Sequence, residues 1–177
     1  MATSPIVCPA TPADLEAVAE IYAHYVTDSV ITFEQVPPTV ADWRRRLDEL
    51  SERGLPFLVA KLGSGTGETG EAGEVVGYAY AGPWRPKPAY RHTVENTVYL
   101  APGRTGLGLG SALLTRLLHE CEQAGVRQIV AVIADTGSDA SPALHRRFGF
   151  VPAGRLTGVG HKHGRWIDTI LMQRSFG

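Results

Sequence analysis

The sequence predicts one mixed α/β domain that covers residues 1–177. A chain of this length can form a single core, and folding it buries roughly 70% of the unfolded surface. Hydrophobic residues make up 44% of the chain and charged residues 20%, as in an ordinary globular protein. Strand and helix patterns follow one another in the order β-α-α-β-β-β-α-β-α-β-β, without a repeat or a domain boundary.

The first predicted elements are a strand, two helices and the loop between the helices. A short strand over residues 6–9 precedes a helix for which Thr11 and Asp14 form a capping box. An extended loop over residues 29–38 leads to a second helix over residues 39–54. The first helix has an apolar stripe that consists of Leu15, Val18, Ile21, Tyr22 and Tyr25.

The middle of the chain alternates strands with polar connections. Strands are expected over residues 56–62 and 74–84, joined by a flexible, low-complexity hairpin loop to which we assign no function. An irregular, proline-containing segment over residues 82–93 carries three cationic side chains. It leads into a strand over residues 94–101.

The second half opens on a glycine loop. Residues 104–114 read RTGLGLGSALL and lie between an apolar strand and a helix over residues 110–125. The later elements are a buried-looking strand over 128–134, a helix over 141–149 and two strands over 150–160 and 165–175.

The charge balance excludes some classes of partner. The chain has 17 basic and 18 acidic residues, so no basic excess points to nucleic acid. No apolar run approaches the length of about 18 residues that spans a membrane, and the N-terminal sequence lacks a signal-peptide pattern. Cys8 and Cys121 have no metal-ligand spacing, and we expect Cys121 to be a packed thiol. We therefore expect a reduced, cytoplasmic protein.

The glycine loop suggests a phosphate site, because glycines before a helix let backbone N–H groups approach an anion. A P-loop is excluded, since it requires a lysine and none occurs between Lys87 and Lys162. A dinucleotide site fits poorly, because the spacing Gly106-x-Gly108-x-Gly110 is wrong and too few residues follow. A structural turn and a coenzyme A pyrophosphate loop are the other two interpretations.

The loop and its surroundings resemble the GCN5-related N-acetyltransferases. That superfamily binds the acetyl-CoA pyrophosphate with an Arg/Gln-x-x-Gly-x-Gly/Ala loop, whose register here begins at Thr105, with Arg104 one residue early. SPALHRRFGF resembles the superfamily's Leu-Tyr/His-x-x-x-Gly-Phe segment. Four blocks in order, residues 22–34, 79–102, 131–150 and 160–174, resemble the phosphinothricin/methionine sulfoximine acetyltransferases.

This resemblance implies a fold and an activity. The fold is a central mixed, mostly antiparallel twisted sheet flanked by helices. The activity is direct transfer of an acetyl group from acetyl-CoA to the α-amine of a small amino acid or analogue, such as phosphinothricin, methionine sulfoximine or methionine sulfone. The resemblance also implies a homodimer.

The resemblance places acetyl-CoA along one strand and the glycine loop. The backbone of residues 98–100 is expected to bond the acetyl carbonyl and the pantetheine, and Ser138 stands where an Asn ligand is usual. The expected cofactor-binding residues are Val98, Tyr99, Leu100, Arg104, Gly106, Leu107, Gly108, Leu109, Gly110, Ser111 and Ser138.

Two side chains are candidates for proton transfer. Strand alternation puts Glu95, Thr97 and Tyr99 on one face, and a carboxylate in a mainly apolar strand is costly unless it has a use. The resemblance also places the general base at Glu95, although a structural ion pair is the alternative. His145 stands where many members carry a tyrosine near the sulfur, so it is the candidate acid, with a packed histidine as the alternative.

Substrate selection is expected to come from the cationic segment, because a guanidinium binds a carboxylate bidentately. Trp84 and Arg85 stand where the resembled family has an aromatic-Arg pair, and Lys87 and Arg91 are further candidates. Each of these charges could instead be a solvated surface group. The expected substrate-binding residues are Phe33, Trp84, Arg85, Lys87, Glu95, Asn96 and Thr97.

No metal is expected. His145, His161 and His163 have no Cys, Asp or Glu nearby at ligand spacing, and the reaction needs no metal. Two other functions stay open: acetylation of protein N-termini or another amine, and a coenzyme A-binding regulatory module without turnover.

Overall fold

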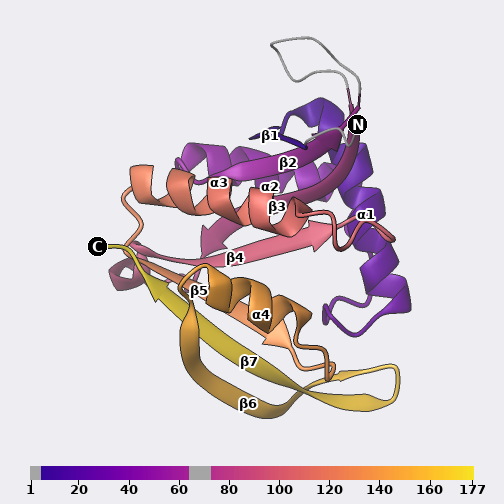
Figure 1. Ribbon diagram of the computed structural model, residues 1–177, viewed down its shortest axis with the longest axis vertical. Coiled ribbons are helices and arrows are strands. Elements are labelled where there is room, and N and C mark those ends of the chain that lie inside the picture. The colour runs from indigo at the N-terminus through magenta and orange to yellow at the C-terminus, as the bar shows by residue number, and fades with distance from the viewer. Residues whose placement is uncertain (1–4, 64–72) are drawn as a thin grey trace.

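A computed structural model describes residues 5–63 and 73–177 and contains the predicted elements in the predicted order (Figure 1). Most of the low-complexity loop, residues 64–72, lies outside the described residues. The strands are β1 (Ile6–Pro9), β2 (Phe57–Leu62), β3 (Glu74–Pro83), β4 (Thr93–Leu100), β5 (Gln128–Ala134), β6 (Val151–Lys162) and β7 (Arg165–Ser175). The helices are α1 (Leu15–Asp28), α2 (Val40–Glu52), α3 (Leu109–Gln123) and α4 (Ala140–Arg147), with 3-10 turns η1 (Pro12–Asp14) and η2 (Pro88–Tyr90).

The strands of the described residues form one sheet in the order β1-β2-β3-β4-β5-β7-β6. Every neighbouring pair is antiparallel except β4 and β5, which run parallel. The mixed, mostly antiparallel sheet is therefore confirmed. A doubly wound dinucleotide fold is ruled out, because it requires a mainly parallel sheet.

Alternation along the strands divides the core between the two faces of the sheet. On β2, Leu58 and Ala60 pack with the buried leucines of α3, whereas Phe57 and Val59 pack with α1 and α2 around Trp43. Figure 1 accordingly shows α3 and α4 on the near side of the sheet, with α2 behind it. The predicted alternation along β4 holds as well, since Val94 and Val98 face α3 and Tyr99 faces the other core.

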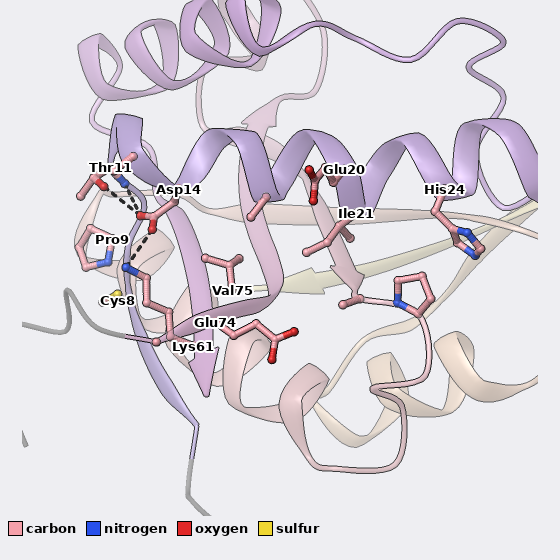
Figure 2. A pocket seen from close by; sticks show the side chains of 15 residues that line it. Cys8, Pro9, Thr11, Asp14, Glu20, Ile21, His24, Lys61, Glu74 and Val75 are labelled. Atoms are coloured by element: carbon pink, nitrogen blue, oxygen red, sulfur yellow. Dashed lines mark hydrogen bonds and ion pairs between the residues drawn. The ribbon is translucent and has the colours of Figure 1, made fainter. Parts of the chain in front are cut away.

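The start of α1 differs from the prediction in one detail. The capping box of Thr11 and Asp14 is present, but it closes the 3-10 turn η1, and α1 itself begins at Leu15. Asp14 also pairs with Lys61 of β2 at 2.8 Å, while the backbone N–H and the hydroxyl of Thr11 donate to the same carboxylate. Figure 2 shows this ion pair in a hollow of about 1050 Å³ beside α1. Its central charges satisfy each other.

The parallel strands β4 and β5 separate soon after they meet. Their ladder pairs Thr93 with Gln128 and ends where Glu95 pairs with Val130. The prediction of a buried strand over 128–134 is therefore wrong in its second half, where Val132 is 37% exposed. Beyond Glu95, β4 keeps its partner β3 on one edge and faces an opening in the sheet on the other.

The loop between α1 and α2 is anchored by the hairpin of β6 and β7. The buried ammonium of Lys162 donates to the carbonyl oxygen of Thr32 at 2.9 Å. The ring of Phe33 lies against Gly160, at a distance that leaves no room for a Cβ atom. A Cβ atom at this position would force the Phe33 ring to shift, so Gly160 of the hairpin helps to set where Phe33 lies.

Candidate active site

Two pockets meet at Glu95, where the sheet opens. The first, of about 330 Å³, lies toward α4 and is lined mainly by residues 95–99 of β4, 131–134 of β5 and the following loop and helix. The second, of about 280 Å³, lies toward α1 and α2. Residues that line both pockets are Ile31, Glu95, Thr97, Tyr99, Val132 and Ala134. The opening between β4 and β5 therefore connects the two faces of the sheet.

The Glu95 carboxylate has the properties of a proton acceptor. In the part of the chain that the structure describes, it has no hydrogen bond and no salt bridge. Burial raises its pKa above the usual glutamate value, and the positive charge of Arg85 opposes this rise. A carboxylate with a raised pKa is a stronger base, and it stands at the junction of the two pockets.

The pocket toward α4 holds His145 against Asn96. The Nδ1 atom of His145 lies 2.8 Å from the carbonyl oxygen of Ser141, which can only accept, so Nδ1 carries the proton. Nε2 therefore accepts from Nδ2 of Asn96, 2.9 Å away. Burial lowers the pKa of His145, and the Ser141 hydrogen bond opposes this only in part. The imidazole is neutral in this arrangement.

This geometry bears on the predicted role of His145 as an acid. A neutral ring with Nδ1–H directed at Ser141 has no proton aimed into the pocket. To donate, it must first gain a proton at Nε2, and the Asn96 amide must turn so that Oδ1 accepts from it. Oδ1 of Asn96 is buried without a hydrogen-bond partner among the described residues, so this turn exchanges the present bond from Nδ2 to Nε2 for a bond from Nε2–H to Oδ1. The acid role stays a prediction.

Backbone groups along the opening form the rest of this pocket. Val98 and Tyr99 line it, and their strand has no β5 partner at these positions. The carbonyl oxygen of Leu100 accepts a hydrogen bond from the hydroxyl of Tyr25 at 2.5 Å. Ser138 lines the pocket too, with its hydroxyl accepting from the backbone N–H of Ala140 at 3.3 Å.

The glycine loop leads into the N-terminus of α3. Gly106 and Gly108 have φ of 77° and 75°, the left-handed conformation that favours glycine, and Gly108 is the residue that precedes the helix. Gly110 faces Leu144 of α4, where an added Cβ would lie 3.2 Å from the side chain. The loop therefore presents backbone N–H groups, as a pyrophosphate site requires.

The side chain of Arg104 is held away from this loop by a salt bridge. Its guanidinium pairs with Glu74 of β3 at 2.8 Å. The pairing is exposed and weak, but it holds the side chain toward β3. Contact of Arg104 with a pyrophosphate stays a prediction.

The pocket toward α1 and α2 is rich in aromatic and polar groups. Phe33 and Thr97 line it as expected, and Tyr22 hydrogen-bonds Thr32 at 2.6 Å in its wall. Asn96, predicted to bind substrate, lines only the other pocket, because its position in β4 turns it to the opposite face. Its predicted contact with substrate is not supported by this placement.

The cationic segment lies outside both pockets. Trp84 is half-buried, and Arg85 stacks on its ring, 4.8 Å from the centroid. Lys87 is exposed at the start of η2. Arg85 nevertheless acts electrostatically on Glu95, so it is the member of this segment that the structure brings toward the site.

Sequence reasoning missed three residues of the pocket wall. Arg46 of α2 and Tyr80 of β3 line it, and Thr169 of β7 contributes a buried hydroxyl without a hydrogen-bond partner among the described residues. A signal for Arg46 was present, because it lies three residues after the buried Trp43 and so on the same side of the helix. Nothing in the sequence singles out Thr169.

The described residues contain neither a metal-binding cluster nor a membrane-spanning helix. Within residues 5–63 and 73–177, no three His, Cys, Asp or Glu side chains gather in a way that could hold a metal ion. No helix of the same residues is long and apolar enough to cross a membrane.

An opening of this kind gives access to Glu95 from both faces of the sheet. A long, thin acyl donor can lie along the unpaired edge of β4, while an amine reaches the same carboxylate from the pocket toward α1 and α2. The site can therefore hold two ligands that meet at Glu95.

Comparison with known proteins identifies the family. The family model described as "Acetyltransferase (GNAT) domain" matches residues 8–171. A phosphinothricin N-acetyltransferase of Alcaligenes faecalis is 46% identical over 161 residues, which are 91% of this chain and 77% of the relative. An L-methionine sulfoximine/L-methionine sulfone acetyltransferase of Pseudomonas aeruginosa is 38% identical over 91% of this chain and 88% of its own.

A solved structure agrees. The phosphinothricin acetyltransferase of Sinorhizobium meliloti in complex with AcCoA is 40% identical, with a TM-score of 0.88, over 98% of this chain and 89% of that one. The chain belongs to the GNAT acetyltransferase family and is an N-acetyltransferase.

Proposed function

We propose that this enzyme transfers the acetyl group of acetyl-CoA to the α-amine of phosphinothricin, methionine sulfoximine or methionine sulfone. The observation that carries the proposal is the unpaired carboxylate of Glu95 at the junction of two pockets. The names of the relatives at 46% and 38% identity support the substrate class. The size of the pocket toward α1 and α2, about 280 Å³, suits a single amino acid.

The residues present fit acetyl-CoA. Glycines 106 and 108 and the N-terminus of α3 would hold the pyrophosphate, and the open edge of Val98 and Tyr99 would hold the pantetheine and the acetyl carbonyl. When bound, the coenzyme supplies a thioester that an amine can attack.

The protein's own contribution is to position the amine and manage protons. Glu95 accepts a proton from the substrate ammonium, directly or through a water, which frees the nitrogen lone pair. Arg85 binds the α-carboxylate, since it is the cation that acts on Glu95. When acetyl-CoA is bound, His145 would supply the proton that the departing sulfur requires, after Nε2 has taken up a proton from solvent and the Asn96 amide has turned.

The test compares Glu95→Gln with Glu122→Gln, an exposed control on α3. With acetyl transfer followed by release of the coenzyme A thiol, we expect Glu95→Gln to lose well over about tenfold in kcat, because the base is gone. The KM for acetyl-CoA and the rate of the control should stay unchanged. An unchanged rate and pH profile in Glu95→Gln would reject the base assignment.

A substrate panel distinguishes the two alternatives. Turnover of an N-terminal peptide but not of free amino acids would favour a protein acetyltransferase. Binding of acetyl-CoA without even a single turnover on any amine would favour a regulatory module. The proposed function requires turnover of the amino acid analogues.

We further propose a homodimer that uses the hairpin of β6 and β7. Trp166 is 73% exposed and Val159 53% exposed there, so this hairpin leaves two hydrophobic side chains uncovered in the single chain. Light scattering on the protein as it elutes from a size-exclusion column measures its mass and so distinguishes a dimer from a monomer. That residues 1–177 form one domain, and that the protein is cytoplasmic, stay predictions.

A further inference from the structure

Arg46 places an unneutralised positive charge in the wall of the substrate pocket. Its guanidinium lies 5.0 Å from the ring centroid of Trp43 and 5.4 Å from that of Tyr80. It donates a hydrogen bond to the hydroxyl of Tyr80 at 2.9 Å. Two aromatic faces and one hydroxyl hold the Arg46 guanidinium in place. No carboxylate of the described residues forms a salt bridge with it. The neighbouring Arg44 and Arg45 on the same helix both have such partners.

Arg46 is also the one cation among the described residues that line this pocket. The two acids there are Glu95 and Glu34, so the pocket offers carboxylates to an amine and a single guanidinium to an anion. A held guanidinium without a carboxylate keeps its donors available for a ligand oxyanion. The unpartnered hydroxyl of Thr169 in the same pocket independently indicates a polar ligand.

The sheet register separates Arg46 from Glu95. Tyr80, which holds Arg46, pairs with Thr97, whereas Glu95 pairs with Gly82. Two residues along a strand correspond to about 7 Å. Trp84 and Arg85 follow on the side of Glu95 away from Tyr80, where the Trp84 N–H bonds the carbonyl oxygen of Thr93. The two cations therefore lie in opposite directions from Glu95, with Arg46 in the pocket wall and Arg85 outside it. An amino acid with its amine at Glu95 can therefore meet a cation at each end.

We propose that Arg46 binds the anionic group at the far end of the substrate side chain and so favours amino acids whose side chains end in an oxyanion. This inference rests on the proposed function and on its assignment of the α-carboxylate to Arg85. Phosphinothricin and methionine sulfone make the test sharp. They share one carbon skeleton, but the first ends in a charged phosphinate and the second in a neutral sulfone.

The experiment measures KM and kcat for both compounds in the wild type, Arg46→Gln and Arg45→Gln. In Arg46→Gln we expect the KM for phosphinothricin to rise by about tenfold or more, because a charge-assisted bond is lost. The KM for methionine sulfone should change by less than about threefold on the scale of a neutral hydrogen bond, and that for acetyl-CoA should not change. Arg45→Gln, exposed on the same helix, should match the wild type.

Each other outcome has a distinct meaning. An equal rise in KM for both compounds would place Arg46 on the α-carboxylate and overturn the inference, as would no change for either. If Arg46→Gln is poorly folded, Arg46→Lys, which retains the charge without the planar guanidinium, takes its place, and its KM for phosphinothricin should rise by more than its KM for methionine sulfone. A Lys variant that affects both compounds alike would overturn the inference. Wild-type enzyme that acetylates neither compound would instead overturn the proposed function, and this inference with it.

Discussion

Asp14 and Glu95 are both carboxylates set among apolar strands and helices, yet their surroundings are opposite. Asp14 receives the ammonium of Lys61 at 2.8 Å and two bonds from Thr11. Burial alone would raise its pKa, but these donors outweigh it and hold the pKa below the usual value. Glu95 receives no such bond from the described residues, and burial raises its pKa.

The difference separates structural charge from functional charge. A buried carboxylate that is saturated with donors contributes to stability and has nothing left to offer a substrate. One that is left without donors costs stability and is ready to take a proton. The larger hollow lies beside the structural pair of Figure 2, whereas Glu95 stands at the junction of the two smaller pockets.

The largest effect should come from Asp14→Asn. The change leaves the Lys61 ammonium buried without its counter-charge, which costs about 3–5 kcal/mol in the free energy of unfolding. Urea denaturation measures this loss, and kcat per folded molecule should be unaffected. Asp48→Asn, at an exposed pair with Arg44, is the control and should lose no more than about 1 kcal/mol. An equally small loss in Asp14→Asn would show that the Asp14–Lys61 pair does not stabilise the fold.

The same pair predicts a pH dependence. Because the folded-state pKa of Asp14 is lowered, its contribution is fully present above the unfolded value of about 3.9. It is lost as the pH falls through the lower, folded-state pKa. Acid unfolding should thus begin at a higher pH once Asp14 is replaced.

Glu95→Gln makes the same chemical change with the opposite expected sign. The raised pKa means that the ionised carboxylate is less stable in the folded protein than in the unfolded chain. At neutral pH the neutral amide should therefore raise the free energy of unfolding, by about 1 kcal/mol. Thermal unfolding of both variants tests whether Asp14→Asn lowers the free energy of unfolding and Glu95→Gln raises it. A destabilised Glu95→Gln would show that Glu95 has a structural partner.

The sequence predicted the order and type of every described strand and α-helix, because each has a local signal. Capping at Thr11 and Thr39 and the leucine stripe of α3 are examples. The burial of Val132 was misjudged, because periodicity shows that a strand is apolar but not that its neighbour leaves it. The separation of β4 and β5 is a property of the whole sheet.

The site was predictable where one residue is out of place in its own element. Glu95 stands out as a charge in an apolar strand, and the glycines stand out before a helix. Arg46 has only a weak local signal, its spacing from the buried Trp43, because a run of arginines on a helix usually covers a solvated face. Its role depends on Trp43 and Tyr80, and Tyr80 reaches it only through tertiary packing.

The smallest effect should be the shift of the pH profile in Arg85→Gln. The positive charge of Arg85 stabilises the ionised form of Glu95, so its removal raises the pKa of Glu95 further. The acid limb of kcat/KM should then move slightly to higher pH, because Arg85 is exposed and its charge is screened by solvent. Added salt should shrink the difference between the wild type and the variant. Arg44→Gln, on the outer side of α2, should leave the limb in place. A limb that moves in neither variant would mean that Arg85 and the base are not coupled, and Arg46 would then be the first candidate for the charge that tunes the site.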